Sequence, residues 1–345
     1  MKIVFVVPDM AGGGTEKVIT LLANEYVKRN IAVDILMFAG SQVAYKLDER
    51  VKTVSMGAAS QGNLSVRCKR LLNMRKYFKH NRGCYIFSFS TYGTGFIVMS
   101  TIGMRFQMLV SERTDPRSCD HKLYRNFFYH FANRLVFQTQ DAMNCFPKSI
   151  RKKACVVPNP VDPYLPEPFK GERKKTIVSV GRLQPVKNYS MLIDAFHGFI
   201  KKYSEYTLHF YGQGDMEAQL KEQASRLGLS EKIIFHGFCE NVKEEIRDSG
   251  MFTLTSNYEG ISNAMVEALA MGIPVIATDC PTGGCRMYIK DGENGLLVPV
   301  GDVKALEKAM AQIAENREFA DKLSDRGIVV KKDCSVEQIA DKLLI

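Results

Sequence analysis

Two glutamates stand eight residues apart in a stretch that could bind a sugar and a phosphate: Glu259 directly precedes Gly260, and Glu267 follows further on. A carboxylate accepts hydrogen bonds from hydroxyl groups, so one glutamate could hold a sugar and the other a ribose. Gly260 lets the backbone approach a ligand closely, and the expected helix start offers N–H groups of Ile261 and Ser262 to a diphosphate. Alternatively, Glu259 complements the helix dipole and Glu267 is a solvated residue.

A second candidate group consists of two cations that follow an expected strand at residues 176–180. Arg182 offers a planar fork of N–H donors and Lys187 a compact charge, and both suit the oxygens of a pyrophosphate. Two cations in a plain surface loop would look the same. Two glycine turns also stand at the carboxyl ends of expected strands, where open α/β sheets bind ligands. They contain Gly212, Gly214, Gly237 and Phe238.

A glycine-rich turn, Ala11–Lys17, lies between the first expected strand and the first expected helix. Gly12 and Gly14 fit the beginning of a dinucleotide-binding fingerprint, but Lys17 occupies the position of its third glycine. The fingerprint therefore fails, and a plain helix entry remains one interpretation.

These residues are positioned by apolar runs that alternate with amphipathic stretches, which predicts α/β architecture with parallel, doubly wound sheets. The expected strands of the first half are residues 2–8, 31–38, 85–90, 107–111 and 134–138. Those of the second half are residues 176–180, 207–211, 233–236, 251–255, 274–278 and 295–298. Five prolines within residues 156–171 exclude a helix or a central strand and predict a linker between two Rossmann-like domains.

The composition of the 345 residues, 46% hydrophobic and 24% charged, allows two buried cores. No apolar run approaches the roughly 20 residues that span a bilayer, and the chain does not start with a secretory leader pattern. The nine cysteines form no Cys-x-x-Cys pair, and the six histidines are scattered, so neither a disulfide framework nor a metal site is indicated. We therefore expect a cytoplasmic protein without metal or cofactor.

The positive charge is concentrated in the first half of the chain. Residues 1–165 carry 24 Lys and Arg against 11 Asp and Glu (24 − 11 = +13), whereas the remainder carries 23 against 26 (23 − 26 = −3). This asymmetry indicates an anionic partner for the first half, either an acidic membrane surface or a phosphate-bearing acceptor, with nucleic acid as the competing interpretation.

Two segments contribute to this basic half. Leu64–Arg82 has an apolar helical stripe bordered by cations, as in a surface-lying helix or an ordinary helix with a solvated basic edge. Lys122–Arg134 places several aromatic residues among basic ones, which suits either an interface or buried packing.

The stretch from Glu259 to Val275 resembles the Glu-x7-Glu signature of GT4-type retaining glycosyltransferases, and every fixed position of that signature is matched. The loop with Arg182 and Lys187 resembles the Gly-Arg-Leu-x-x-x-Lys-Asn loop of the same family. The turns around Gly212, Gly214, Gly237 and Phe238 resemble its Gly-x-Gly loop and its turn beside the nucleobase. Near the N-terminus, Gly13 and Gly14 resemble its Gly-Gly-x-Glu loop, which faces the donor phosphates.

The resemblance implies the GT-B fold, in which two Rossmann-like, doubly wound parallel-sheet domains face each other across a cleft. We expect an acceptor-binding domain at residues 1–163, a donor-binding domain at residues 164–330, and a C-terminal helix within residues 331–345 that returns toward the first domain.

The resemblance also implies roles for individual residues. Arg182 and Lys187 would neutralise the departing nucleotide, Glu259 would hold the transferred sugar and Glu267 the ribose. Gly260, Ile261, Ser262 and Asn263 would complete the donor site around the helix start. The implied reaction is a metal-independent, front-face transfer without an enzymic nucleophile, because fixed cations and N–H groups stabilise the leaving diphosphate.

The implied donor is a nucleotide sugar, with UDP as the nucleotide and a hexose or N-acetylhexosamine as the sugar. The implied acceptor is lipid-linked or an oligosaccharide, in the synthesis of bacterial surface glycans. We expect the protein at the inner face of the plasma membrane, bound through its basic first half, with no nucleic-acid partner.

Two stretches depart from the family pattern. Ser111-Glu112-Arg113 stands where many relatives have Ser-Glu-His, and Arg113 cannot act as a base at neutral pH but could bind a phosphate or an acceptor. Gly283 and Gly284 match a family glycine turn, but the Pro and Glu that often follow it are absent.

Three other functions each match part of the sequence. A nicotinamide-dependent oxidoreductase needs an acidic residue after the second strand, which residues 37–40 do not supply. A sugar-nucleotide epimerase of the same fold needs additional acidic or histidine catalysts. A non-catalytic nucleic-acid-binding protein would use the basic half but would not require the four charged residues of the second half.

Overall fold

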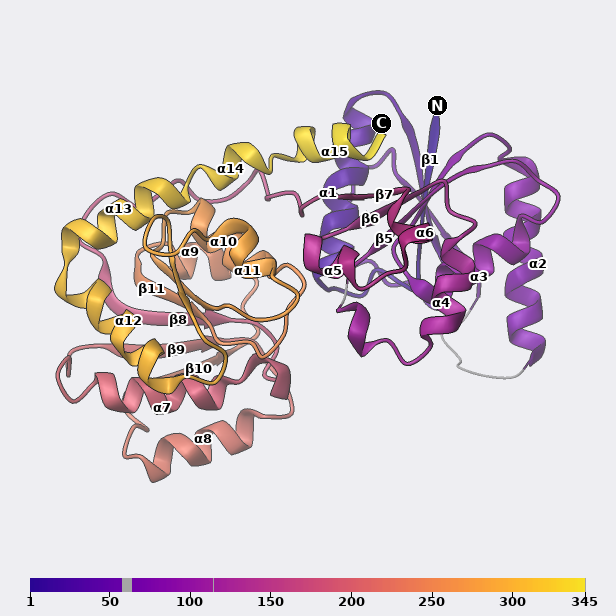
Figure 1. The fold of residues 1–345 in the computed structure, drawn as a ribbon. Coiled ribbons are helices and arrows are strands. Elements are labelled where there is room, and N and C mark those ends of the chain that lie inside the picture. The colour runs from indigo at the N-terminus through magenta and orange to yellow at the C-terminus, as the bar shows by residue number, and fades with distance from the viewer. Residues whose placement is uncertain (58–63, 114, 345) are drawn as a thin grey trace. The chain divides into compact units, whose positions relative to one another are not determined.

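The computed structural model describes residues 1–57, 64–113 and 115–344. The chain divides into two compact units (Figure 1). Unit 1 comprises Met1–Pro160 together with Val336–Ile345, and unit 2 comprises Val161–Ser335. The chain therefore passes from one unit to the other inside the proline-rich stretch and returns to unit 1 for its last helix.

Unit 1 is built on a seven-stranded sheet in the order β3-β2-β1-β4-β5-β6-β7, with all pairings parallel. Its strands are β1 (Lys2–Val7), β2 (Ala32–Met37), β3 (Lys52–Ser55), β4 (Tyr85–Ser88), β5 (Gln107–Glu112), β6 (Arg134–Phe137) and β7 (Ala154–Val156). Its helices are α1 (Gly14–Lys28), α2 (Leu64–His80), α3 (Thr91–Ser100), η1 (Pro116–Ser118), α4 (Lys122–Tyr129), α5 (Gln140–Asn144), α6 (Lys148–Arg151) and α15 (Val336–Leu344).

The central strand β1 of unit 1 is buried on both of its faces, which explains its unbroken apolar run. Ile3 and Phe5 belong to a core shared with α1 and α15, whereas Val4 and Val6 belong to a second core shared with α2. The last helix is fixed to α1 because the Tyr26 hydroxyl donates to the Ala340 carbonyl at 3.0 Å.

Unit 2 contains a six-stranded parallel sheet in the order β10-β9-β8-β11-β12-β13. Its strands are β8 (Lys174–Val180), β9 (Thr207–Tyr211), β10 (Ile233–Gly237), β11 (Ser249–Leu254), β12 (Val275–Thr278) and β13 (Leu296–Val298). Its helices are η2 (Pro185–Lys187), α7 (Tyr189–Phe199), α8 (Glu217–Arg226), α9 (Val242–Ile246), α10 (Asn263–Ala270), α11 (Gly284–Tyr288), α12 (Val303–Glu315), α13 (Arg317–Gly327) and α14 (Val330–Asp333). Successive residues of β8 again enter different cores, with Ile177 on one face and Val178 on the other.

The expected α/β class with two doubly wound parallel sheets is confirmed. Two short strands were not predicted. β3 (Lys52–Ser55) lies at the edge of the sheet with Val54 half-buried and its other three residues exposed, so its sequence lacks an apolar run. β7 (Ala154–Val156) is an edge strand of three half-buried residues. Within the described ranges, no helix combines the length and apolar character that crossing a membrane requires.

Candidate functional site

The predicted donor residues of unit 2 follow the carboxyl ends of neighbouring strands. Arg182 and Lys187 follow β8, Gly212 and Gly214 follow β9, Gly237 ends β10, and Glu259 follows β11. Because these four strands are adjacent in the order β10-β9-β8-β11, their loops lie side by side along one edge of the sheet. This edge is where open α/β sheets bind ligands.

Lys187 and Glu259 form an ion pair at this edge. The Lys187 Nζ lies 2.5 Å from Glu259 Oε2, and the two side chains retain only 16% and 20% of their exposure. Ser256 Oγ also donates to this carboxylate oxygen, at 3.2 Å. The predicted sugar-binding carboxylate is therefore already oriented by the predicted phosphate-binding lysine.

Backbone contacts fix the Lys187 loop independently of that side chain. Thr255 Oγ1 donates to the Lys187 carbonyl at 2.9 Å, and the Asn257 N–H donates to the Val186 carbonyl at 2.8 Å. The side-chain amide of Asn188 donates to Asn257 Oδ1 at 3.0 Å. The loops after β8 and β11 are thus joined through groups that a substitution of the Lys187 side chain leaves in place.

Glycines bring the backbones of neighbouring loops into contact. A Cβ at Gly212, whose φ is +137°, would lie 2.0 Å from the Gly181 carbonyl oxygen, and one at Gly214 would lie 2.3 Å from that of Leu183. The Leu183 N–H in turn donates to the Gln213 carbonyl at 2.9 Å. Glycine is therefore required at both positions to seat the loop after β9 against the loop that carries Arg182.

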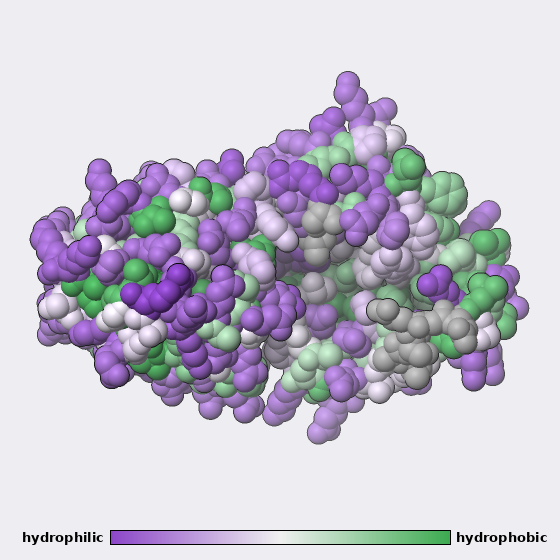
Figure 2. Space-filling view, turned by 90° about the horizontal axis from the view of Figure 1, so that it is seen from below, coloured by the Kyte–Doolittle hydropathy of each residue, from purple (hydrophilic) through white to green (hydrophobic). Residues whose placement is uncertain are grey.

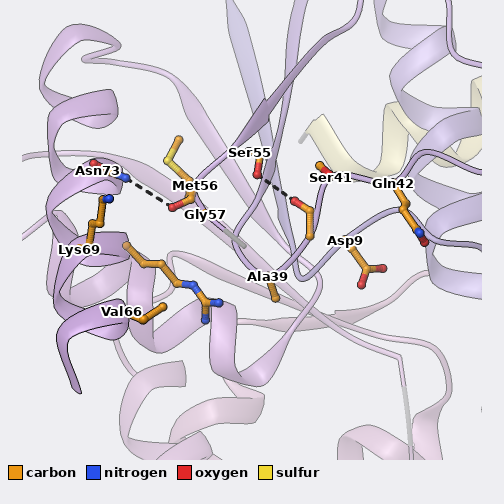
Figure 3. A pocket seen from close by; sticks show the side chains of 12 residues that line it. Asp9, Ala39, Ser41, Gln42, Ser55, Met56, Gly57, Val66, Lys69 and Asn73 are labelled. Carbon is orange, nitrogen blue, oxygen red and sulfur yellow. Dashed lines mark hydrogen bonds between the residues drawn. The ribbon is translucent and has the colours of Figure 1, made fainter. Parts of the chain in front are cut away.

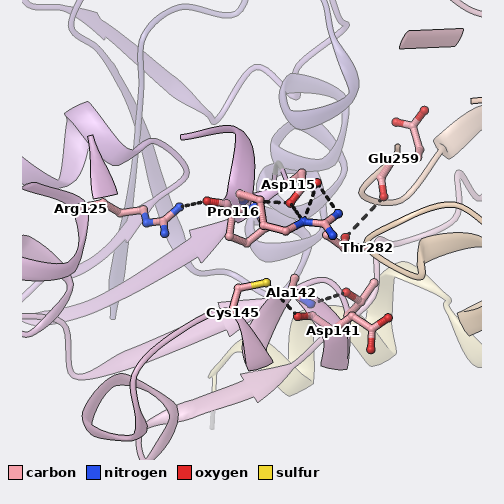
Figure 4. A network of polar contacts seen from close by, with 10 residues as sticks. Asp115, Pro116, Arg125, Asp141, Ala142, Cys145, Glu259 and Thr282 are labelled. Atoms are coloured by element: carbon pink, nitrogen blue, oxygen red, sulfur yellow. Dashed lines mark hydrogen bonds and ion pairs between the residues drawn. The ribbon is translucent and has the colours of Figure 1, made fainter. Parts of the chain in front are cut away.

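A second close approach joins the loops after β11 and β12. A Cβ at Gly284 would lie 1.5 Å from the Gly260 carbonyl oxygen. The main chain of Glu259 donates to the Pro281 carbonyl at 2.6 Å and accepts from the Thr282 N–H at 3.0 Å; Figure 4 draws Glu259 and Thr282 together. The turn that the family resemblance matched only in part thus supports Glu259 directly.

The helix after Glu259 begins later than the sequence indicated. Ser262 is the N-cap of α10, its hydroxyl accepts from the Met265 N–H, and Asn263 is the first helical residue. The helix-start amides therefore begin at Asn263, while Ile261 and Ser262 precede the helix and are buried. Glu267 lies in the second turn of α10 and is half-buried.

Two predicted residues extend from the edge into solvent. The Arg182 side chain is exposed and forms no hydrogen bond or ion pair with other residues that the structure describes, whereas its main-chain carbonyl accepts from the Gln184 N–H at 2.8 Å. Phe238, which follows Gly237 at φ +68°, keeps 77% of its exposure. An unpaired guanidinium and an open ring are both available to a ligand.

Two histidines lie side by side next to the Gly237 turn: His236, which belongs to the predicted turn motif, and His209, which was not predicted from the sequence. His209 Nδ1 and His236 Nε2 are 2.9 Å apart, and the His236 ring stacks on that of Tyr211 with centroids 4.3 Å apart. Burial lowers the pKa of His209 from 6.5 to about 4, with a smaller contribution from the charge of His236. Burial also lowers the pKa of His236. Both imidazoles are therefore favoured in the neutral form.

We expect unit 2 to lose stability when these histidines are forced to take up protons. Since the pKa of His209 in the folded protein lies below that of the unfolded chain, its contribution is present above pH 6.5 and is lost as the pH falls toward about 4. Calorimetric melting temperatures across this interval should fall less steeply for His209→Gln than for the wild type. The same substitution at exposed His80 should leave the slope unchanged, and equal slopes for the wild type and His209→Gln would contradict the prediction.

In unit 1, the predicted Gly13–Gly14 loop forms the beginning of α1. Gly13 is the extended N-cap residue, without a side chain to cap the helix, and Gly14 is the first helical residue. A Cβ at Gly13 would meet only the flexible carboxylate of Glu16. The turn therefore presents backbone at a helix start, as a phosphate-facing loop requires.

The Ser111–Arg113 stretch contributes to a buried polar network in unit 1. Glu112 accepts from the Tyr129 hydroxyl at 2.9 Å and lies 3.8 Å from the Arg125 guanidinium. Arg113 donates to the Asn159 side chain and lies over the ring of Phe89. Sequence reasoning singled out neither Arg125 nor Asn159; the only signal for the latter was a polar residue between two prolines.

Two cavities open at the carboxyl ends of the unit 1 strands. One, of about 400 Å³, is lined by Glu112, Arg113 and the residues after β1 and β4. The other, of about 880 Å³, lies at the ends of β1, β2 and β3 against α2 (Figure 3). Its polar lining includes Asp9, Lys69 and Arg70, so it suits a ligand with both hydroxyl and anionic groups. No group of three or more His, Cys, Asp or Glu suited to a metal ion occurs among the residues described.

Comparison with known proteins agrees with this architecture. Residues 163–330 match the family described as "Glycosyl transferases group 1". A relative from Haemophilus influenzae, an "Uncharacterized glycosyltransferase", is 22% identical over 98% of this chain and 97% of its own. A Campylobacter jejuni relative is 25% identical over 100% of this chain and 97% of its own. It is named "GalNAc-alpha-(1->4)-GalNAc-alpha-(1->3)-diNAcBac-PP-undecaprenol alpha-1,4-N-acetyl-D-galactosaminyltransferase".

Solved structures share the fold across the whole chain. HepE of Anabaena in complex with UDP matches with a TM-score of 0.82 at 19% identity, covering 100% of this chain and 98% of its own. The lipopolysaccharide outer core galactosyltransferase WaaB matches with a TM-score of 0.78 at 19% identity over the same shares. The family match over residues 163–330, the full-length relatives and the motifs along the edge of the unit 2 sheet identify the chain as a group 1 (GT4-type) glycosyltransferase, and the solved structures show that it has the GT-B fold.

Proposed function

We propose that this glycosyltransferase moves a hexose or N-acetylhexosamine from a UDP-sugar to a lipid-linked or polysaccharide acceptor, with retention of anomeric configuration, in bacterial surface glycan synthesis. The observation that carries the proposal is the Lys187–Glu259 pair at the carboxyl edge of the unit 2 sheet, beside the unpaired guanidinium of Arg182. One anionic and two cationic groups at one edge suit a ligand that joins a sugar to a diphosphate.

The donor is bound by unit 2 in this proposal. Arg182, Lys187 and the amides at the start of α10 bind the diphosphate, Glu259 binds the transferred sugar, and Glu267 binds the ribose. Gly237 and Phe238 lie beside the base, where the exposed ring can pack. The UDP bound to HepE supports UDP as the nucleotide. In the same proposal, Gly13 and Gly14 of unit 1 present backbone amides that suit a phosphate.

The reaction breaks the bond between the anomeric carbon and the diphosphate oxygen and forms a bond from that carbon to the acceptor oxygen on the same face. The acceptor proton passes to the leaving diphosphate. Arg182 and Lys187 stabilise the negative charge that grows on the diphosphate, so the step needs neither a metal ion nor an organic cofactor.

The acceptor is bound by unit 1 in this proposal. The larger cavity of that unit combines hydroxyl-binding groups with Lys69 and Arg70, which suits a sugar carried on a phosphate or diphosphate. The undecaprenol-linked acceptor named for the Campylobacter jejuni relative supports a lipid carrier. A protein that uses such an acceptor works at the inner face of the plasma membrane, to which its basic unit 1 is attracted.

A panel of nucleotide sugars, assayed for nucleotide release in the presence of membrane acceptor lipids, tests the proposal. We expect turnover with a UDP-sugar and formation of a glycosylated lipid. A sugar-nucleotide epimerase would instead convert the donor to an isomer without acceptor, and a nucleic-acid-binding protein would bind oligonucleotides with strong salt dependence and show no affinity for UDP.

Substituting Glu267 probes the donor site. Glu267→Ala should raise the Kd for the UDP-sugar by about ten- to 150-fold, because a hydrogen bond to a charged group contributes about 1.5–3 kcal/mol. Glu231→Ala, at an exposed position after α8, is the control and should leave titration calorimetry unchanged. If no donor turned over with the lipids present and Glu267→Ala bound donors as the wild type does, the proposed function would be wrong.

A further inference from the structure

Helix α4 (Lys122–Tyr129) of unit 1 is polar on its inner side and apolar on its outer side. Arg125 is 2% exposed and donates to the Pro116 carbonyl at 2.8 Å (Figure 4), while its guanidinium lies over the Phe146 ring. Leu123, by contrast, keeps 89% of its exposure and Phe127 keeps 60%. A surface helix normally has the opposite arrangement, so the outer side of α4 is suited to contact an apolar partner rather than water.

The exposed apolar residues form a continuous ridge. Leu123, Phe127 and Phe131 recur every four residues, and Phe131 keeps 54% of its exposure. The rings of Phe127 and Phe131 are 5.5 Å apart. Tyr92 of α3, which keeps 55% of its exposure, continues the ridge through Tyr124 at 6.0 Å. We call Tyr92, Leu123, Phe127 and Phe131 the α4 ridge.

The ridge is held in place by the polar inner side of α4 and by α3. α3 and the Tyr124 ring are in close contact at Gly95, where an added Cβ would lie 1.9 Å from the Tyr124 hydroxyl. Arg125 and Tyr129 on the inner side both contact Glu112. The ridge is therefore not a frayed segment but the fixed outer surface of a packed helix.

The neighbouring helices are basic and carry further exposed apolar residues. α3 packs against both α2 and α4, and Arg75 of α2 donates to the carbonyls of Ser100 and Ile102 at the end of α3. Leu72 of α2 and Ile102 keep 66% and 65% of their exposure. Residues 51–111 contain nine Lys and Arg but no Asp or Glu. In Figure 2, hydrophobic side chains in green lie exposed among purple ones on unit 1.

Resting on the proposed use of a lipid-linked acceptor, we propose that the α4 ridge inserts into the interface of an anionic bilayer while the basic residues of α2 contact its head groups. Large apolar groups bordered by cations match both layers of such a surface, the acyl boundary and the negative phosphates. The cations of α2 are Arg67, Lys76 and Lys79, and Arg82 follows directly after the helix; all four are exposed.

Vesicle flotation tests the ridge. The full chain should bind vesicles of phosphatidylcholine with phosphatidylglycerol and should not bind vesicles of phosphatidylcholine alone. A ridge variant, Phe127→Ser with Phe131→Ser, should bind about a hundredfold more weakly, because each buried phenyl ring contributes about a factor of ten. Lys76→Gln and Lys79→Gln should each weaken binding about fivefold at low salt. The control is Tyr164→Ser with Val329→Ser, at exposed apolar positions of unit 2.

The absence of tryptophan from the chain gives a second readout that does not depend on affinity. In Phe127→Trp, the single indole should shift its emission to the blue on anionic vesicles and be quenched by brominated lipids, whereas in Tyr164→Trp it should not. Equal vesicle binding by the wild type and the ridge variant, or an unshifted indole at position 127, would overturn the proposal. So would conversion of a dimer to a monomer by the ridge variant without loss of vesicle binding.

Titration with UDP separates this proposal from the proposed function. The ridge variant should bind UDP as the wild type does, because its substitutions lie in unit 1 on the outer side of α4. A chain that floats through its ridge but binds no UDP would refute the donor assignment alone. A chain that binds UDP and never floats would refute the ridge assignment alone.

Discussion

Lys187→Ala is expected to lower kcat by about 10²–10³ with a UDP-sugar donor, the effect of removing one fixed group that stabilises charge in the transition state. The lysine lies 2.5 Å from Glu259 in a pair that is largely shielded from water, so its charge is little screened. Because negative charge on the diphosphate grows as the sugar leaves, the loss should appear mainly in kcat rather than in KM.

Substitutions of Lys187 can remove its charge while the loop that carries it keeps its conformation. The contacts of Thr255 and Asn257 with the Lys187 loop use backbone atoms of that loop, so Lys187→Met should retain its conformation and melt near the wild-type temperature. The matched control is Lys232→Met in the same unit. Glu259→Gln should reduce activity as well, and the double variant should lose less than the sum of the two, since the residues form one pair. Steady-state kinetics within threefold of the wild type for Lys187→Ala would exclude the role of Lys187.

The loops of unit 2 were predictable because each rule involved is local. An apolar run ends, a glycine or cation follows, and the carboxyl ends of parallel strands place those residues along one edge. Arg182, Gly212 and Glu259 could therefore be located without a structure. Glu259 and Lys187 were each proposed for the donor, but 72 residues separate them, so their ion pair could not be predicted from the sequence.

Features that depend on distant partners were not predictable. In the sequence, the segment of helix α4 is a mixture of aromatic and basic residues. No neighbouring residue indicates that Arg125 is buried while Phe127 is exposed. That choice follows from Glu112, which lies on another element and needs a cation when buried. The neutral His209–His236 pair likewise arises from the pairing of β9 with β10. Short edge strands such as β3 also escape detection because most of their residues are exposed and therefore need not be apolar.

Gly284→Ala is expected to destabilise unit 2 by about 3–5 kcal/mol, the range in which single substitutions reflect severe steric or packing defects. The added methyl group would lie 1.5 Å from the Gly260 carbonyl oxygen, and the nearest atoms belong to backbone rather than to a flexible side chain. The loops after β11 and β12 must therefore separate. Such a movement breaks the hydrogen bonds of the Glu259 main chain to Pro281 and Thr282.

The separation of the two loops should also weaken donor binding, because the main-chain hydrogen bonds to Pro281 and Thr282 hold Glu259 in position. Calorimetry should show the melting temperature of unit 2 lowered by roughly 10 °C, with the transition of unit 1 unmoved. UDP-sugar affinity should fall even at temperatures where the variant is folded.

Gly228→Ala is the matched control, since its φ of +70° carries a conformational cost while nothing lies within 4 Å of an added Cβ. It should lose only about 1 kcal/mol and bind donor normally. If the two variants melted alike, the cost would come from backbone conformation in general, and the contact between Gly284 and Gly260 would not hold the loop of Glu259 in place. If Gly284→Ala alone melted early yet bound the UDP-sugar as tightly as the wild type, the two loops would contribute to stability without positioning Glu259 for the donor.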